Sequence, residues 1–166
     1  MAEILNNSLP EHPFWNFSLH LYQQAGIAKH CLELQDQYGA DVNILLFCCW
    51  LGSIGAESLS IDQLRFLSEQ VGDWHKNAIS PLRQLRRRLK NSVKAVSKDH
   101  RESIRQAIQR IEIEAEHVEQ LILAEAISWQ INPTLTLSAR AEITTDNLRN
   151  YLTMLNIKID QDAHRH

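Results

Sequence analysis

The sequence predicts an all-α protein that folds as a single-domain bundle of six or seven helices. Apolar residues recur at intervals of three and four along most of the chain, whereas the alternation typical of β-strands is almost absent. Helix-capping and helix-breaking residues separate these periodic segments. With 166 residues, the chain is long enough to bury one hydrophobic core. We therefore expect one helical domain over residues 1–166.

Three helices are expected in the first third of the chain. The first covers residues 13–22 and begins with proline, which suits the first helical position. The second covers residues 26–38 and ends at Gly39, a typical C-terminal cap. Asp41 caps the third helix, residues 42–54, which is apolar all round. A helix of that composition is expected at the buried centre of the domain.

The middle of the chain is expected to form two further helices. Ser60 and Gln63 make a capping box that opens a helix reaching about residue 79. Ser80 followed by Pro81 resembles an N-cap and first helical residue, so a new helix is expected there, with a kinked continuation as the alternative. The apolar stripe of this helix comprises Leu82, Leu85, Leu89, Val93 and Val96.

A long helix with a coiled-coil-like seam is predicted over residues 99–129, within a segment bounded by residues 98 and 131. The seam comprises Ile104, Ile108, Ile111, Ala115, Val118 and Ile122. Its intervals of four and three predict packing against another helix, either within the chain as an antiparallel arm or in a homodimer. Thr145 is predicted to cap a short C-terminal helix, residues 146–156, in the segment 145–157.

Charge is distributed unevenly along the chain. The formal net charge is −3, from 17 Lys and Arg against 20 Asp and Glu. Residues 1–75 are acidic, whereas residues 76–101 contain Asp99 as their one acid among many bases. The bases are Lys76, Arg83, Arg86, Arg87, Arg88, Lys90, Lys94, Lys98 and Arg101. Such segregation bears on the choice of partner rather than on the fold.

The first functional hypothesis is a non-enzymatic binding or adaptor protein that uses a basic helix face. The predicted contact residues are Arg83, Arg86, Arg87, Lys90 and Lys94. Guanidinium groups form bidentate contacts with carboxylates and phosphates, so we expect an acidic protein partner, with a ribonucleoprotein as the alternative. A solvated helix face that pairs with the protein's own acids would produce the same pattern.

The second hypothesis, from another class, is an all-α enzyme that binds a small molecule. Amides and carboxylates gather between two apolar helices, and buried groups of this kind need hydrogen-bond partners. Arg83 and the tryptophan indoles are the nearest suitable partners. The predicted pocket comprises Trp15, Gln35, Asp36, Asn43, Trp50, Trp74 and Arg83. A hydrogen-bond network that only fixes helix packing would explain the same residues.

No metal, cofactor or catalytic group is predicted. Glu114 and His117 have the spacing found in di-metal carboxylate bundles, but the second such pair that this class requires is missing. The chain also has only five Gly and no glycine-rich phosphate loop. The sequence therefore favours neither a metalloenzyme nor a nucleotide-binding enzyme.

The composition favours a cytoplasmic protein without a membrane anchor. Cys31, Cys48 and Cys49 lack disulfide or metal-site spacing, so buried reduced thiols are expected. The N-terminal residues include acids and lack the basic region of a signal peptide. The longest apolar run, residues 44–51, is far shorter than the roughly 20 residues that cross a bilayer.

Several sequence strings over residues 14–90 together resemble a known family. They are Phe14-Trp15-x-Phe17-Ser18-Leu19, Cys31-Leu32-x-Leu34-Gln35-Asp36, Gly39-x-Asp41-Val42-Asn43-x-Leu45-Leu46-Phe47, Trp50-Leu51, Trp74 and Pro81-Leu82-Arg83-x-Leu85-Arg86-Arg87. The family is an uncharacterised one of small bacterial, mainly proteobacterial, cytoplasmic proteins with a domain of unknown function. The resemblance implies a helical intracellular protein and supplies no activity.

Overall fold

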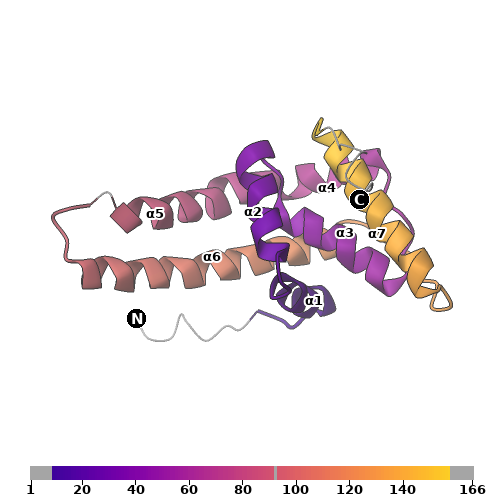
Figure 1. Cartoon of the computed structure of the whole chain (residues 1–166), viewed down its shortest axis with the longest axis horizontal. Helices are drawn as coiled ribbons and strands as arrows, with labels where there is room; N and C mark the ends of the chain where they lie inside the picture. Colours follow the sequence, from indigo (N-terminus) through magenta and orange to yellow (C-terminus); the bar gives the residue numbers. More distant parts are fainter. Residues whose placement is uncertain (1–8, 92, 158–166) are drawn as a thin grey trace, which may run out of the picture.

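The computed structural model describes residues 9–91 and 93–157, which are all-α as predicted (Figure 1). The helices are α1 (Pro13–Tyr22), α2 (Ile27–Tyr38), α3 (Val42–Ile54), α4 (Ile61–Trp74), α5 (Ser80–Asn91), α6 (Lys98–Ala126) and α7 (Leu137–Met154). A π-helical turn, η1 (His75–Ile79), joins α4 to α5 without a break. Counted this way, the described part contains six helices. None of them is both long and apolar enough to span a membrane.

Local signals position the first three helices as the sequence predicts. Gly39 ends α2 in the left-handed region, with φ of 69°. Two residues later, the Asp41 carboxylate accepts the Asn43 backbone N–H at 2.8 Å and caps α3. Ser60 and Gln63 form the predicted capping box at the start of α4. These contacts set the entry of α3 into the core.

Helix α3 is the buried centre of the bundle, as its composition predicts. It packs against α1, α2, α6 and α7 (Figure 1). An aromatic cluster ties these elements together: the Trp50 ring lies 5.2 Å from Phe14 and 5.4 Å from Trp129, between centroids. Phe14 is also 5.2 Å from Phe47. Trp50 therefore belongs to the core and not to a pocket, because aromatic rings surround it.

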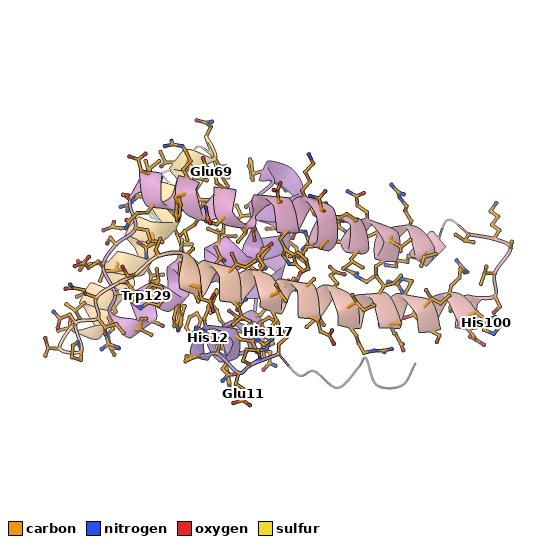
Figure 2. The ribbon with its side chains drawn as sticks, turned by 180° about the vertical axis from the view of Figure 1, so that it is seen from behind. Glu11, His12, Glu69, His100, His117 and Trp129 are labelled. Carbon is orange, nitrogen blue, oxygen red and sulfur yellow. The ribbon has the colours of Figure 1, made fainter. Side chains whose placement is uncertain are left out.

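Helices α5 and α6 form an antiparallel arm that extends away from the bundle (Figure 1). His100 lies near the tip of the arm, and Trp129 lies at the far end of the molecule (Figure 2). This is the antiparallel packing that the long periodic segment predicts. The base of the arm, where it meets the bundle, brings the polar residues of α5 and α6 close to α1, α2 and α3.

Of the two alternatives at Ser80 and Pro81, the structure shows the continuation: α5 begins at Ser80 directly after η1, and the helix runs on through Pro81. The Ser80 N–H donates to the His75 carbonyl, five residues back, as in a π-helix. A proline ring in an α-helix would clash with the carbonyl four residues earlier and would leave that carbonyl unpaired. The wider turn η1 accommodates Pro81 and shifts the register of the helix before it. Such π turns occur frequently at functional sites.

The predicted seam of α6 is rotated from the face that the structure buries. Ile108 and Ala115 are buried as predicted, but Ile104 and Ile111 are each 51% exposed. Polar residues occupy several interior positions of α6 instead, beginning with Glu112. The buried residues of α6 are Ile108, Glu112, Ala115, His117, Glu119, Gln120 and Leu123. The apolar pattern assigned the isoleucines to the buried face. It could not assign Glu112 there, because the pattern contains no information on the arginines of α5 that neutralise this acid.

The C-terminal helix begins nine positions earlier than predicted. Thr136 is the N-cap, and its hydroxyl accepts the Ala139 N–H at 3.2 Å. Thr145 lies inside α7, where its hydroxyl donates to the Ala141 carbonyl four residues back. A threonine bonded in this way does not cap a helix. The prediction mistook a mid-helix threonine for a start signal.

Candidate functional site

The basic helix α5 faces acids on α6 at the base of the arm. Arg86 donates from Nε and Nη2 to the Glu112 carboxylate at 2.6 and 3.1 Å. Arg83 donates from Nε to the same carboxylate at 3.3 Å and from Nη2 to Glu116 at 3.2 Å. Glu112 is buried, and these two guanidinium groups offset the free-energy cost of removing its carboxylate from water. We call Arg83, Arg86, Glu112 and Glu116 the Arg–Glu cluster.

The Arg–Glu cluster removes two residues from the predicted basic surface. Arg83 and Arg86 turn into the arm instead of toward solvent. Arg87 remains half exposed and pairs with Asp36 of α2 at 3.1 Å, where both side chains are 51% exposed. Lys90 and Lys94 are exposed toward the tip of the arm. The five predicted partner-binding residues therefore do not share one surface.

A cavity of about 290 Å³ opens between α1, α2, α3 and the base of the arm. Its apolar wall comprises Trp15, Leu19, Tyr22, Leu32, Val42, Leu46 and Ile113. Its polar wall comprises Ser18, Gln35, Asp41, Asn43, Arg83, Arg86, Arg87, Gln109, Glu112, Glu116 and Gln120. The Arg–Glu cluster thus contributes charged groups to a cavity that aromatic and aliphatic side chains also line.

Four of the predicted pocket residues meet in this cavity and three do not. Trp15, Gln35, Asn43 and Arg83 line it. Asp36 lies outside, on the exposed side of α2, where it pairs with Arg87. The other two residues outside are tryptophans: Trp50 packs in the aromatic core, and Trp74 donates from its indole to the Ala115 carbonyl at 2.9 Å.

A chain of hydrogen-bonded polar side chains runs from the cavity lining to Glu119. Ser18 donates to Gln120 Oε1 at 3.2 Å, and Gln120 Nε2 donates to Asn43 Oδ1 at 2.9 Å. Asn43 Nδ2 then donates to Glu119 Oε1 at 2.9 Å. All four residues are buried. The sequence places them on three separate helices, and their donors and acceptors satisfy one another as buried polar groups require.

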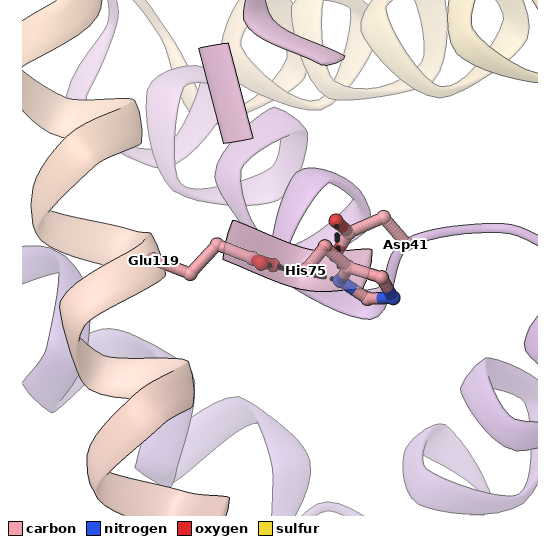
Figure 3. A group of neighbouring side chains, drawn as sticks. All are labelled: Asp41, His75 and Glu119. Atoms are coloured by element: carbon pink, nitrogen blue, oxygen red, sulfur yellow. Dashed lines mark hydrogen bonds and ion pairs between the residues drawn. The ribbon is translucent and has the colours of Figure 1, made fainter. Parts of the chain in front are cut away.

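At the end of this chain lie Asp41, His75 and Glu119, which we call the inner trio (Figure 3). His75 Nδ1 lies 3.2 Å from Asp41 Oδ2 and 3.1 Å from Glu119 Oε2. The three side chains come from the α3 cap, from the π turn and from α6. The Glu119 side chain is fully buried, whereas Asp41 and His75 are 13% and 29% exposed.

The inner trio perturbs the acidity of its members. Hydrogen bonds to Asp41 and then to Glu119 raise the pKa of His75 to about 10, against the opposing effect of burial. Burial raises the pKa of Glu119, and the neighbouring Asp41 charge adds to the effect. Burial is the largest single effect on Asp41 and would raise its pKa, but the hydrogen bond to His75 and the charge of His75, together with the hydrogen bond from the Asn43 backbone, lower that pKa on balance. One imidazolium thus faces two carboxylates with limited access to solvent.

Sequence reasoning missed His75 as a site residue, and it considered Glu119 only as part of an acidic face, residues 112–119, that a partner could contact. A usable signal was present in the spacing of Glu112, Glu116 and Glu119, which places three acids on one face of a helix that must pack. His75 carries no such local signal, because its position depends on the π turn. Asp41 was recognised only as a helix cap.

The Glu114–His117 spacing does not mark a site. Glu114 is exposed, whereas His117 is buried against Trp15, with ring centroids 4.3 Å apart and planes 4° apart. His117 lies beside the N-terminal segment that carries His12 (Figure 2). Burial lowers the pKa of His117 and favours the neutral ring that stacks on the indole.

Comparison with known proteins identifies one family. No curated protein matches the chain, and neither does any solved structure. The family model described as "Protein of unknown function (DUF2390)" matches residues 13–123, from the start of α1 into α6. It includes the inner trio, the Arg–Glu cluster and the residues 14–90 that carry the family resemblance. The chain therefore belongs to the DUF2390 family, a domain of unknown function.

Proposed function

We propose that the protein binds a small organic carboxylate in the cavity at the base of the arm. The observation that carries this proposal is the composition of the cavity lining, which combines the three guanidinium groups of Arg83, Arg86 and Arg87 with aromatic and aliphatic side chains. A volume of about 290 Å³ is at the lower end of the range for small-molecule sites. The ligand that fits has an apolar body and one anionic group.

The arginines favour an anion because they are oriented in advance. Glu112 holds Arg83 and Arg86 in place, and Arg87 lies beside them at the cavity wall. The pair between Arg87 and Asp36 is exposed on both sides, so it contributes little stability and exchanges readily for a ligand carboxylate. Arg87 is therefore the residue that we assign to contact the anionic group.

The apolar part of the ligand is proposed to lie against Trp15 and Leu19. Trp15 is fixed from behind by His117, which stacks on its ring. The amides of Asn43 and Gln120 lie in the same cavity wall and are already bonded to each other. They therefore add polar surface to the cavity lining without requiring the ligand to satisfy them.

Binding is tested with a panel of carboxylic acids that have apolar bodies, each paired with its neutral primary amide. Thermal unfolding and tryptophan fluorescence are measured on the full chain, with Trp15→Phe to identify the responding indole. An acid that fits should raise Tm by at least about 5 °C at one hundred times its Kd. Its amide should not. If no acid in the panel shifts either signal, carboxylate binding is rejected.

Arg87→Gln and Arg88→Gln form a matched pair for this assay. Both residues are exposed on α5, but only Arg87 lines the cavity. We expect Arg87→Gln to weaken binding about tenfold, as for loss of a charge-assisted contact, and Arg88→Gln to leave it unchanged. Equal weakening by both variants would indicate attraction by the general surface charge instead of a cavity contact.

A second candidate function is the adaptor role in the cytoplasm, now restricted to the distal part of the arm. The observation that favours it is the exposure of Arg88, Lys90 and Lys94, for which the described residues provide no acidic partner within ion-pair distance. An acidic protein surface is the proposed partner. Replacing these three residues with Glu should abolish capture of partner proteins from native cytosol, and unchanged capture by the folded variant would remove this candidate.

A homodimer through Ile104 and Ile111, both half exposed, is the alternative use of the arm.

A further inference from the structure

We propose that the inner trio, Asp41, His75 and Glu119, binds one divalent transition-metal ion. This inference goes beyond the cavity ligand proposed above and does not depend on it. The three side chains provide one imidazole nitrogen and two carboxylates from three separate segments, with one donor atom of each within 4.8 Å of the others. Imidazole combined with carboxylate suits Zn²⁺, Mn²⁺ or Fe²⁺ better than Ca²⁺ or Mg²⁺.

The spacing of the donor atoms fits a coordination sphere. His75 Nδ1 lies 3.2 Å from Asp41 Oδ2 and 3.1 Å from Glu119 Oε2 (Figure 3). Ligand atoms that surround one ion at bond lengths of about 2.1 Å are themselves about 3.0 to 3.4 Å apart. The donor atoms of Asp41 and Glu119 lie within 4.8 Å of each other, so a metal ion that replaces the His75 proton needs at most a closer approach of these two carboxylates.

The charge of the trio also favours a cation. His75 can neutralise only one of the two carboxylates, and no Lys or Arg lies within ion-pair distance of Asp41 or Glu119 in the described part of the chain. Buried carboxylates are stable only when they are paired, protonated or bound to a metal.

Neighbouring residues hold the proposed ligands in position. Asn43 Nδ2 donates to Glu119 Oε1, while the Asn43 backbone N–H donates to Asp41 Oδ1. Outer-sphere contacts of this kind orient carboxylate ligands and raise metal affinity. Asp41 also forms part of the cavity wall, so the site has a route to solvent. Three protein ligands leave at least one coordination position open, as in catalytic zinc sites and unlike closed structural ones.

The test uses the full chain in a background where His164 and His166 are replaced with Ala, because the terminal histidines could bind metal themselves. After removal of metal with EDTA, Zn²⁺ and Mn²⁺ are titrated separately by calorimetry. The expected result is one equivalent of at least one ion per chain, with Kd below about 10 μM. If neither ion binds in this titration, the metal proposal is overturned and no variant needs to be measured. That result would leave the cavity proposal unaffected.

His75→Asn and Glu119→Gln are compared with His30→Asn and Glu114→Gln, which alter exposed residues of the same types. The first two should weaken binding about tenfold or more, and the controls should not change it. Circular dichroism confirms that each variant folds. If either trio variant unfolds, Co²⁺ bound to the unmodified site provides the second readout, since its visible absorption bands depend on ligand type and number. Binding that His75→Asn and Glu119→Gln leave unchanged, or Co²⁺ spectra of the fully hydrated ion, would refute the assignment.

Discussion

Arg86 binds Glu112 with both sides of its guanidinium fork, at 2.6 Å from Nε and 3.1 Å from Nη2. The Glu112 carboxylate is almost fully buried between α5 and α6, and Arg83 supplies a third N–H donor to it. A carboxylate at an interior helix position is stable only because these donors replace the water that it loses. The arm is thus joined at its base by charge as well as by apolar contact.

Removing the Glu112 charge should destabilise the protein strongly. Glu112→Gln leaves two partly buried guanidinium groups facing a neutral amide, and we expect the free energy of unfolding to fall by about 3 kcal/mol. Glu114→Gln, on the exposed side of the same helix, should change it by less than about 0.5 kcal/mol. Urea unfolding measures both. Similar losses in the two variants would contradict the structural role of the Arg–Glu cluster.

Replacement by alanine should change the free energy of unfolding in opposite directions at two helical glycines, Gly52 and Gly72. A Cβ at Gly52 would overlap the Thr144 hydroxyl and lie 2.8 Å from the Thr144 backbone nitrogen, whereas a Cβ at Gly72 meets nothing within 4 Å. Gly52→Ala should therefore lower the free energy of unfolding by about 3 kcal/mol through forced separation of α3 and α7. Gly72→Ala, at an exposed position of α4, should raise it by about 0.5 to 1 kcal/mol. Thermal and urea unfolding would show whether the signs differ as stated.

The phenol of Tyr151 is predicted to stabilise the start of α3. Its oxygen accepts the Asp41 backbone N–H at 2.9 Å, and the side chain is buried. Tyr151→Phe leaves that N–H without its partner, so the free energy of unfolding should fall by about 1 to 2 kcal/mol. Tyr38→Phe is the control, because Tyr38 is exposed. Chemical denaturation that finds the two variants equally stable would exclude this tether between α7 and the cap.

The three cysteines should react slowly with thiol reagents in the native protein. Burial raises the pKa of Cys31 and Cys48, and it raises that of Cys49 to about 11, so the thiolate forms only well above neutral pH. At pH 8 the thiolate fraction of Cys49 should be about one hundredth of that of an ordinary thiol. Ellman's reagent in native buffer and in urea measures the contrast. Rapid titration of all three thiols in native buffer would contradict the burial.

Local signals were sufficient for α1, α2 and α3, because their caps and turns lie within a few residues of the helix ends. Gly39 and Asp41 are examples, since each acts through contacts with its own segment. Glu112 was unpredictable as a core residue, because its stability there depends on arginines more than twenty positions away. His75 was unpredictable as a site residue for a similar reason: a π turn imposed by Pro81 determines where it lies.

The candidate cavity was predictable in composition and not in shape. Gln35, Asn43 and Arg83 stand out in the sequence as polar residues near apolar helices, and the structure brings them to one wall. Asp36 has the same character but does not line the cavity: it is exposed and pairs with Arg87, because one hundred degrees of rotation per residue separates it from Gln35. Small errors in the helical phase therefore decide which polar neighbours face inward.

The continuous helix from Ile61 to Asn91 has a mechanical consequence. His75 stands near its middle, Glu119 lies on α6, and Asp41 is the N-cap of α3. A change in the angle between this helix and the loop before α3 would therefore change the distance between the His75 imidazole and the Asp41 carboxylate. The geometry of the three residues that we expect to hold an ion therefore depends on how three separate segments are placed relative to one another.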